Sequence, residues 1–84
     1  ALADGGVAAG LTRKKALEYA AQTLLGTAKL AMAENAHPAA LKDDVCSPGG
    51  STIAGVRALE EHAFRAACMD AVIAAWQRTR ELGQ

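Results

Sequence analysis

The sequence predicts an all-α fold, and three observations support this prediction. Apolar residues recur at helical spacing from about Arg13 to Glu34, and again from about Ala63 to Leu82. A quarter of the residues are alanine, which is typical of helix faces that approach one another closely. No stretch alternates apolar and polar residues as a half-buried strand would.

The first of these segments predicts one long amphipathic helix that Thr12 caps at its start. The cations at 13–15 would face the positive end of the helix dipole, a small cost if they are exposed. Gly26 interrupts the segment, and we interpret it as a position of close helix packing. Its apolar stripe comprises Leu17, Ala20, Ala21, Leu24, Leu25, Ala28, Ala31 and Met32.

The run Asn35-Ala36-His37-Pro38 ends that helix, because Asn tolerates a left-handed conformation and Pro suits the first position of a new helix. A short helix from Pro38 to about Val45 follows. The turn at 47–52 leads into a third helix, with Ile53, Val56 and Leu59 on one face, and the last helix runs to Leu82. The predicted buried stripe of the last helix comprises Phe64, Ala67, Cys68, Ala71, Val72, Ala75 and Trp76. Residues 4–10 are expected to form the end of a helix that begins before Ala1.

Large apolar side chains are few for a chain of 84 residues and 8.6 kDa. A domain of this size with so little apolar volume would be marginally stable alone. We therefore expect association between copies through the alanine-rich faces. The chain begins at Ala1 rather than Met, and we expect it to be part of a longer protein.

Charge and cysteine content exclude several classes of function. Nine basic residues balance nine acidic ones, whereas a nucleic-acid binder needs a basic excess. No apolar run reaches the length of about 20 residues that spans a membrane. Two cysteines 22 residues apart are too few for a disulfide scaffold or a zinc ribbon, so we expect no metal site and a reducing compartment, the cytoplasm.

The segment Ser47-Pro48-Gly49-Gly50-Ser51-Thr52 could bind an anion. Two glycines let the backbone approach a ligand, and the helix that follows presents unpaired N–H groups and a partial positive charge. The segment lacks the lysine and spacing of a Walker loop. On local features alone, an ordinary turn that is capped by Ser47 or Ser51 and stiffened by Pro48 is the more common interpretation.

The histidines and cysteines have simpler structural interpretations. His37 precedes Pro38 as a helix-entry residue, and His62 lies at a helix boundary. Cys46 and Cys68 are expected to be small buried apolar residues. A Ser-His-Asp triad is excluded because the sequence has neither a G-x-S-x-G elbow nor the strand that carries one.

Taken together, these stretches resemble the C-terminal domain of the Δ1-pyrroline-5-carboxylate reductase family. The most specific match is the segment 45–55, VCSPGGSTIAG. Supporting matches are Asp4-Gly5-Gly6-Val7, Ala9-Gly10-Leu11, AAQTLLG at 20–26, His37-Pro38-Ala39, Leu41-Lys42-Asp43, Ala58-Leu59-Glu60 and Phe64-Arg65-Ala66. The resemblance spans almost the whole chain, and it favours the anion-binding interpretation of the loop over the ordinary capped turn.

The resemblance implies an intertwined helical bundle, a dimerisation domain of the 6-phosphogluconate-dehydrogenase-like C-terminal type. Residues 1–84 would form one dimerisation and substrate-binding domain of an obligate homodimer, which in this family often assembles into a ring of dimers. A Rossmann domain upstream of Ala1 would bind most of the NADPH or NADH. The family reduces Δ1-pyrroline-5-carboxylate to L-proline, and this domain alone would be inactive.

The resemblance also implies roles for individual residues. Backbone N–H groups of Gly50, Ser51 and Thr52 would hold the substrate carboxylate in a loop that includes Ser47 and Gly49. The Thr52 hydroxyl would lie near the substrate nitrogen, where it orients the imine or passes a proton to it. Val45 would lie near the nicotinamide.

Two positions depart from the family pattern: Thr12 stands where proline is common, and Ala36 where a glycine-containing turn is usual. Two other functions remain open. One is a purely structural oligomerisation domain, and the other is the domain of a related imine or keto-acid reductase.

Overall fold

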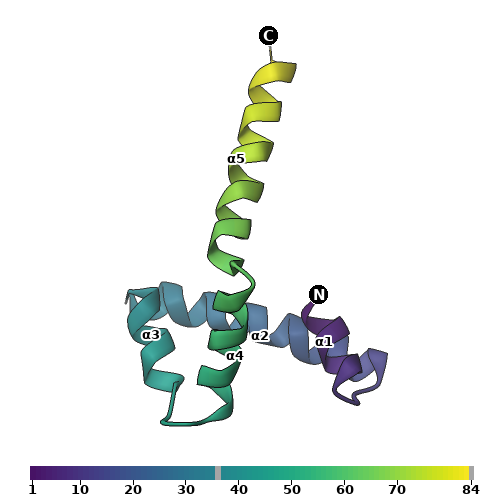
Figure 1. Ribbon diagram of the computed structural model, residues 1–84, viewed down its shortest axis with the longest axis vertical. Coiled ribbons are helices and arrows are strands. Elements are labelled where there is room, and N and C mark those ends of the chain that lie inside the picture. Colours follow the sequence, from purple (N-terminus) through teal and green to yellow (C-terminus); the bar gives the residue numbers. More distant parts are fainter. Residues whose placement is uncertain (36, 84) are drawn as a thin grey trace. The chain divides into compact units, whose positions relative to one another are not determined.

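The computed structural model describes residues 1–35 and 37–83. Within these residues it contains five α-helices and no strand, which confirms the all-α prediction (Figure 1). The helices are α1 (Leu2–Ala8), α2 (Arg13–Glu34), α3 (Pro38–Val45), α4 (Ser51–Glu61) and α5 (Phe64–Leu82). The chain divides into two compact units, Ala1–Asp43 and Asp44–Gln84.

In the first unit, α1 packs beside the beginning of α2 (Figure 1). The turn between them is a Schellman motif: the Leu11 N–H donates to the carbonyl of Gly6 (2.9 Å) and the Gly10 N–H to that of Val7 (3.0 Å). Gly10 has φ +112°, a conformation that favours glycine. Because this turn begins directly after Ala8, α1 ends two residues before the predicted limit at Gly10.

Thr12 caps α2 as predicted, since its hydroxyl oxygen accepts a hydrogen bond from the Lys15 backbone N–H (3.3 Å). Two of the three cations at the start of α2 have acidic partners. Arg13 pairs with Asp4 of α1 at 2.6 Å, and Lys15 pairs with Glu18 at 3.7 Å. Each of these exposed ion pairs contributes less than about 1 kcal/mol to folding stability. They offset the unfavourable interaction of the cations with the positive end of the helix dipole.

The end of α2 follows the sequence prediction. Asn35 has a left-handed conformation with φ 49°, and α3 starts at Pro38. His37 caps α3, because its Nδ1 atom accepts a hydrogen bond from the Ala39 N–H (3.1 Å). Ala36, the other departure from the family pattern, lies outside the described residues.

In the second unit, a tight connection joins α4 to α5. The Ala63 N–H donates to the Glu60 carbonyl (3.1 Å), and Ala63 has φ 55°. A left-handed alanine costs about 1 kcal/mol, so the surrounding contacts must hold this turn. One such contact is the ion pair between Glu60 and Arg65 across the connection (3.0 Å). The last helix therefore begins one residue later than predicted, at Phe64.

The predicted buried stripe of α5 is not buried within a single chain. Val72 is 71% exposed and Trp76 is 55% exposed, and no residue of α5 that the structure describes is buried. In the described part of the chain, only Ala3 and Ala16 are buried, at 7% and 2% exposure. Among the described residues, no atom beyond the backbone of its own helix turn lies within 4 Å of the Cβ position of Gly26, so the expected close packing is not made within the first unit.

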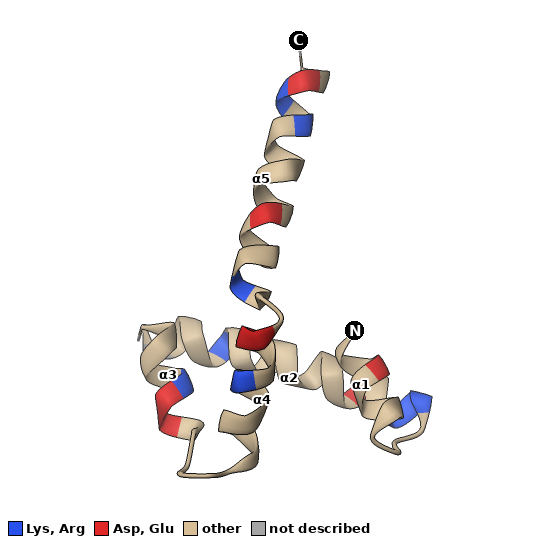
Figure 2. Ribbon diagram, viewed as in Figure 1, with Lys and Arg blue, Asp and Glu red and all other residues tan. Residues whose placement is uncertain are grey.

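The two longest helices, α2 and α5, contain long stretches without charged residues. Figure 2 shows tan stretches in the middle of α2 and in the middle of α5. These correspond to ten consecutive uncharged residues between Glu18 and Lys29, and seven between Asp70 and Arg78. Besides alanines, these stretches carry exposed large apolar side chains, which favours burial against another helix. They are Tyr19, Leu24, Leu25, Val72, Ile73 and Trp76.

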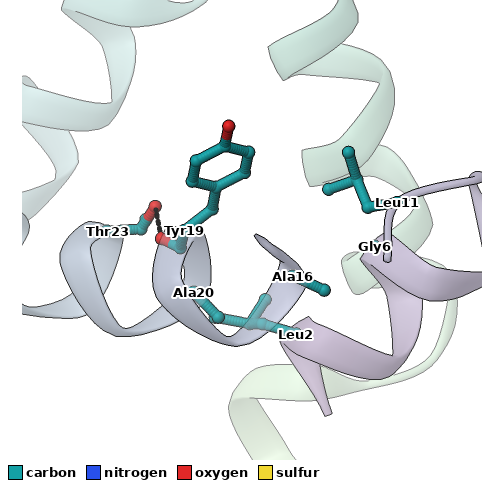
Figure 3. A pocket seen from close by; sticks show the side chains of 7 residues that line it. All are labelled: Leu2, Gly6, Leu11, Ala16, Tyr19, Ala20 and Thr23. Atoms are coloured by element: carbon teal, nitrogen blue, oxygen red, sulfur yellow. Dashed lines mark hydrogen bonds between the residues drawn. The ribbon is translucent and has the colours of Figure 1, made fainter. Parts of the chain in front are cut away.

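Two apolar hollows lie where α1 meets α2. The first, of about 200 Å³, is lined by residues of both helices and of the turn between them, among them Leu2, Leu11, Ala16 and Tyr19 (Figure 3). The Tyr19 ring projects from α2 beside it, and Leu11 stands on the opposite side. The second hollow, of about 440 Å³, is lined by Ala1, Leu2, Ala3, Leu17, Ala20, Ala21 and Leu24.

The packing of α1 on α2 predicts opposite effects for its two adjacent glycines. A Cβ at Gly6 would lie 3.1 Å from Ala16 Cβ and 3.3 Å from Leu11 Cδ1, whereas a Cβ at Gly5 would contact nothing within 4 Å. We expect Gly6→Ala to destabilise the domain by about 1 kcal/mol through overpacking. Gly5→Ala should be neutral or stabilising by up to about 1 kcal/mol. Thermal unfolding of both variants tests this, and equal melting temperatures would contradict it.

The exposed stripe of α2 predicts the effect of a charge within it. Leu24 is 62% exposed and lines the larger hollow. If a second copy covers this face, Leu24→Asp buries an unpaired carboxylate and should cost several kcal/mol, so that association between copies is lost. Gln22→Asp, about 200° around the same helix, is the matched control and should associate normally. Sizing chromatography separates the two, and unchanged association in Leu24→Asp would place the interface elsewhere.

Candidate functional site

The segment between α3 and α4 forms a hydrogen-bonded turn. The Gly50 N–H donates to the Ser47 carbonyl (3.1 Å), with Pro48 and Gly49 as the central residues. Gly49 has φ +66°. Proline followed by a glycine with positive φ is the pattern of a type II β-turn. The four residues Ser-Pro-Gly-Gly thus dictate the turn by local rules, without help from distant contacts.

Immediately after the turn, α4 begins with its backbone N–H groups free. Gly50 is the N-cap residue, and its carbonyl accepts from the Ala54 N–H (3.4 Å). Among the described residues, the N–H groups of Ser51, Thr52 and Ile53 have no acceptor. Three adjacent free donors and the positive end of the helix dipole together favour a carboxylate or phosphate at this point.

The side-chain cap that local features alone favoured for α4 is absent. Neither Ser47 nor Ser51 caps the helix, since no side-chain hydrogen bond is made at its N-cap. The turn places a glycine at the N-cap, with Ser51 already inside the helix. Local features favoured an ordinary capped turn. Because no side chain caps α4, the backbone N–H groups of its first turn are unpaired.

The site contains no cation of its own. On α4, Arg57 is engaged by Glu61 (3.2 Å), and Arg65 at the start of α5 is engaged by Glu60 (3.0 Å). An anion at the beginning of α4 would therefore be bound by backbone dipoles and hydroxyl groups. Ser47, Ser51 and Thr52 are all exposed to solvent and accessible to a ligand.

The turn brings together the predicted substrate-binding residues: Ser47, Gly49, Gly50, Ser51 and Thr52 lie in one turn and the first turn of the helix after it. Val45, the predicted nicotinamide contact, is the last residue of α3 and is 62% exposed. The turn predicted at 47–52 is confirmed. The sequence prediction did not specify its type, although Pro-Gly at its centre is a recognisable signal for type II.

The histidines have the structural roles predicted for them. His37 caps α3, and His62 ends α4, where its N–H donates to the Ala58 carbonyl (3.3 Å). The prediction that both cysteines are buried is wrong for Cys68, which is exposed on α5. Cys46 is half-buried. The exposed Cys68 belongs to the apolar stripe of α5, in which no described residue is buried.

Within the described residues, no three His, Cys, Asp or Glu side chains are grouped so that they could hold a metal ion. None of the described helices combines the length and apolar character that crossing a membrane requires.

Comparison with known proteins identifies the family. Residues 1–82 match the family model described as pyrroline-5-carboxylate reductase dimerisation. The chain belongs to the pyrroline-5-carboxylate reductase family. It is a dimerisation domain of that family, as the sequence resemblance predicted.

Similar proteins come from plants, bacteria and other organisms. The chain is 61% identical to pyrroline-5-carboxylate reductase of Arabidopsis thaliana, over all of this chain and 30% of that protein. It is 57% identical to the Synechocystis enzyme of the same name, over all of this chain and 32% of that protein. A crystal structure of Plasmodium falciparum pyrroline carboxylate reductase with NADP bound matches with a TM-score of 0.92 and 34% identity, over 99% of this chain and 34% of that one.

The dimerisation domain thus spans about a third of the length of these relatives. Its helical fold agrees with that of the Plasmodium reductase over nearly every residue.

Proposed function

We propose that this domain supplies the dimer interface and the substrate-carboxylate loop of a reductase that converts Δ1-pyrroline-5-carboxylate to L-proline with NADPH or NADH. The observation that carries the proposal is the set of unpaired N–H groups at Ser51, Thr52 and Ile53, directly after a type II turn. Full-length relatives are named for this reaction, and the Plasmodium enzyme was crystallised with NADP.

The carboxylate of the substrate would bind at the beginning of α4. The N–H groups of the first helical turn donate to it, and the helix dipole stabilises its charge. Holding the carboxylate there fixes the pyrroline ring in one orientation, which lowers the entropic part of the barrier to reaction.

The reaction itself adds a hydride and a proton across the C=N bond. The bound nicotinamide supplies the hydride to the ring carbon, and the nitrogen takes a proton to become the secondary amine of proline. Thr52 lies in the first turn of α4 and is exposed to solvent. We assign its hydroxyl to the substrate nitrogen, where it orients the imine and passes the proton.

Most of the cofactor would be held outside this domain. Val45 offers an exposed apolar side chain that fits the edge of a nicotinamide ring. The described residues contain no strand, and so no βαβ unit for the phosphates of NADPH or NADH. A Rossmann domain N-terminal to residue 1 would provide that site, and the complete protein, rather than residues 1–84, would be the active enzyme.

The partner of the domain is a second copy of the same chain. Its family is defined by dimerisation, and the apolar faces of α2 and α5 are exposed in the single chain. We propose that these faces intertwine with those of the second copy, and that dimers assemble further into a ring.

The substitution Thr52→Ala in the full-length protein tests the role of the hydroxyl. We expect kcat for pyrroline-5-carboxylate reduction to fall about 100-fold, the lower range for loss of a proton-transfer group. Thr52→Ser keeps the hydroxyl and is the matched control, so its kcat should stay near the wild-type value. Sizing chromatography should show the same assembly for both variants.

Wild-type kinetics in Thr52→Ala would refute the assignment of this residue. A full-length protein that forms dimers but reduces no cyclic imine would support the alternative of a purely structural oligomerisation domain. Preference for another imine or keto acid would support the related-reductase alternative.

A further inference from the structure

The turn between α4 and α5 is built around an alanine in an unfavourable conformation. Ala63 has φ 55° and ψ 41°, in the left-handed region that glycine adopts freely and alanine does not. No side-chain hydrogen bond caps α5 at this residue. Interactions with neighbouring residues must therefore keep Ala63 in this conformation.

Within the second unit, little besides this turn fixes the direction of α4 relative to α5. The two helices lead away from the turn and have few contacts with each other (Figure 1). No described residue of either helix is buried, so no shared core holds them at a fixed angle. The angle depends on the backbone conformation at His62 and Ala63, the two residues between the helices.

One ion pair crosses the turn. Arg65 Nε lies 3.0 Å from Glu60 Oε1, and in the described part of the chain no other ion pair joins α4 to α5. Each charge lies at the helix end that disfavours it, with the carboxylate in the last turn of α4 and the guanidinium in the first turn of α5. The pair therefore stabilises the turn rather than either helix.

We propose that the Glu60–Arg65 ion pair holds Ala63 in its left-handed conformation and thereby sets the direction of α4. Glu60 and Arg65 are positioning residues, because Glu60 lies at the opposite end of α4 from the unpaired N–H groups and Arg65 lies on α5. The inference rests on the proposed function, in which α5 belongs to the dimer interface and the beginning of α4 binds the substrate carboxylate.

The length of α4 amplifies any change at the turn. Its eleven residues span about 16 Å, so a rotation of about 10° at Ala63 moves the beginning of α4 by about 3 Å. A misplacement of about 1 Å already lowers a reaction rate strongly. When the turn leaves its left-handed conformation, the substrate stays bound to α4 but lies away from the nicotinamide. A loss of the ion pair should therefore lower kcat more than it raises KM.

The two opposing contributions at the turn are of similar size. An exposed ion pair stabilises weakly, and the left-handed conformation of alanine is moderately unfavourable. Loss of the ion pair therefore shifts the population of turn conformations without unfolding the helices. Glycine at position 63 would remove the need for the ion pair, because glycine adopts the same conformation without steric cost.

Glu60→Gln in the full-length reductase tests the inference, and Arg65→Gln should act in the same way. We expect kcat for pyrroline-5-carboxylate reduction to fall about threefold, the effect of one exposed ion pair on a population, with KM changed less than about twofold. Amide hydrogen exchange in the turn, followed by mass spectrometry, should become faster. The reason is that the hydrogen bond from the Ala63 N–H to the Glu60 carbonyl (3.1 Å) opens more often.

Ala63→Gly is the rescue variant. Alone, it should keep kcat near the wild-type value, with an equal or higher melting temperature. Combined with Glu60→Gln, it should return kcat and hydrogen exchange to the values of Ala63→Gly alone. Failure of this rescue would overturn the inference, since the carboxylate would then act by a route other than the conformation of the turn. A fall in kcat in Ala63→Gly alone would contradict it as well.

Glu61→Gln is the matched control, because it removes the same charge from the next residue of α4. Glu61 pairs with Arg57 (3.2 Å) inside α4, and this pair does not cross the turn. Its kcat and its hydrogen exchange should equal those of the wild type. An equal fall in kcat in Glu61→Gln and Glu60→Gln would count against the ion pair, since any loss of charge at this end of α4 would then suffice.

Hydrogen exchange separates failure of this inference from failure of the proposed function. A wild type that reduces no pyrroline-5-carboxylate would refute the proposed function, while exchange in the turn would still test the ion pair. Unchanged exchange in both Glu60→Gln and Arg65→Gln would overturn the inference. Faster exchange with an unchanged kcat in an active reductase would also overturn it, because the position of α4 would then not depend on the turn.

Discussion

The structure depends on one constraint: the helices of each unit carry more apolar surface than that unit covers. In the described part of the chain, the only buried residues are two alanines, Ala3 and Ala16. Burial of two methyl groups contributes about 1–2 kcal/mol, far less than the conformational entropy of ordering the chain. Leucines, valines and Trp76 remain exposed along α2 and α5. The fold is therefore completed by association, and the domain is specified by its interface as much as by its interior.

The shape of the candidate site does not depend on burial or association. Its shape comes from local rules, because a proline and a positive-φ glycine make the turn and a glycine N-cap leaves the donors of α4 unpaired. None of this requires a buried core. A site built from backbone atoms on a rigid turn keeps its geometry while the helices around it serve the interface. Under the proposed function, this separation would let one domain of 84 residues provide both the dimer interface and the anion site.

The sequence predicted what short-range rules decide. The limits of α2 and α3 followed from Thr12, Asn35 and Pro38. It did not predict the left-handed Ala63 or the glycine cap of α4, because an unfavourable conformation or an absent hydrogen bond has no positive signal in a sequence. It predicted the apolar faces of α2 and α5 and association between copies, and these faces are exposed in the described residues. Periodicity alone shows that a face is covered but not which element or copy covers it. The roles of Val45 and Thr52 stay predictions, because they depend on groups that are not part of this domain.

The most direct test of the central claim is the native mass and unfolding of the 84-residue chain by itself. Light scattering behind a sizing column should give twice the 8.6 kDa of one chain, or a multiple of that dimer. The melting temperature should rise with protein concentration, because dissociation accompanies unfolding. A folded monomer of 8.6 kDa that melts cooperatively at a temperature independent of concentration would contradict the account, since one chain would then be able to bury its own apolar faces.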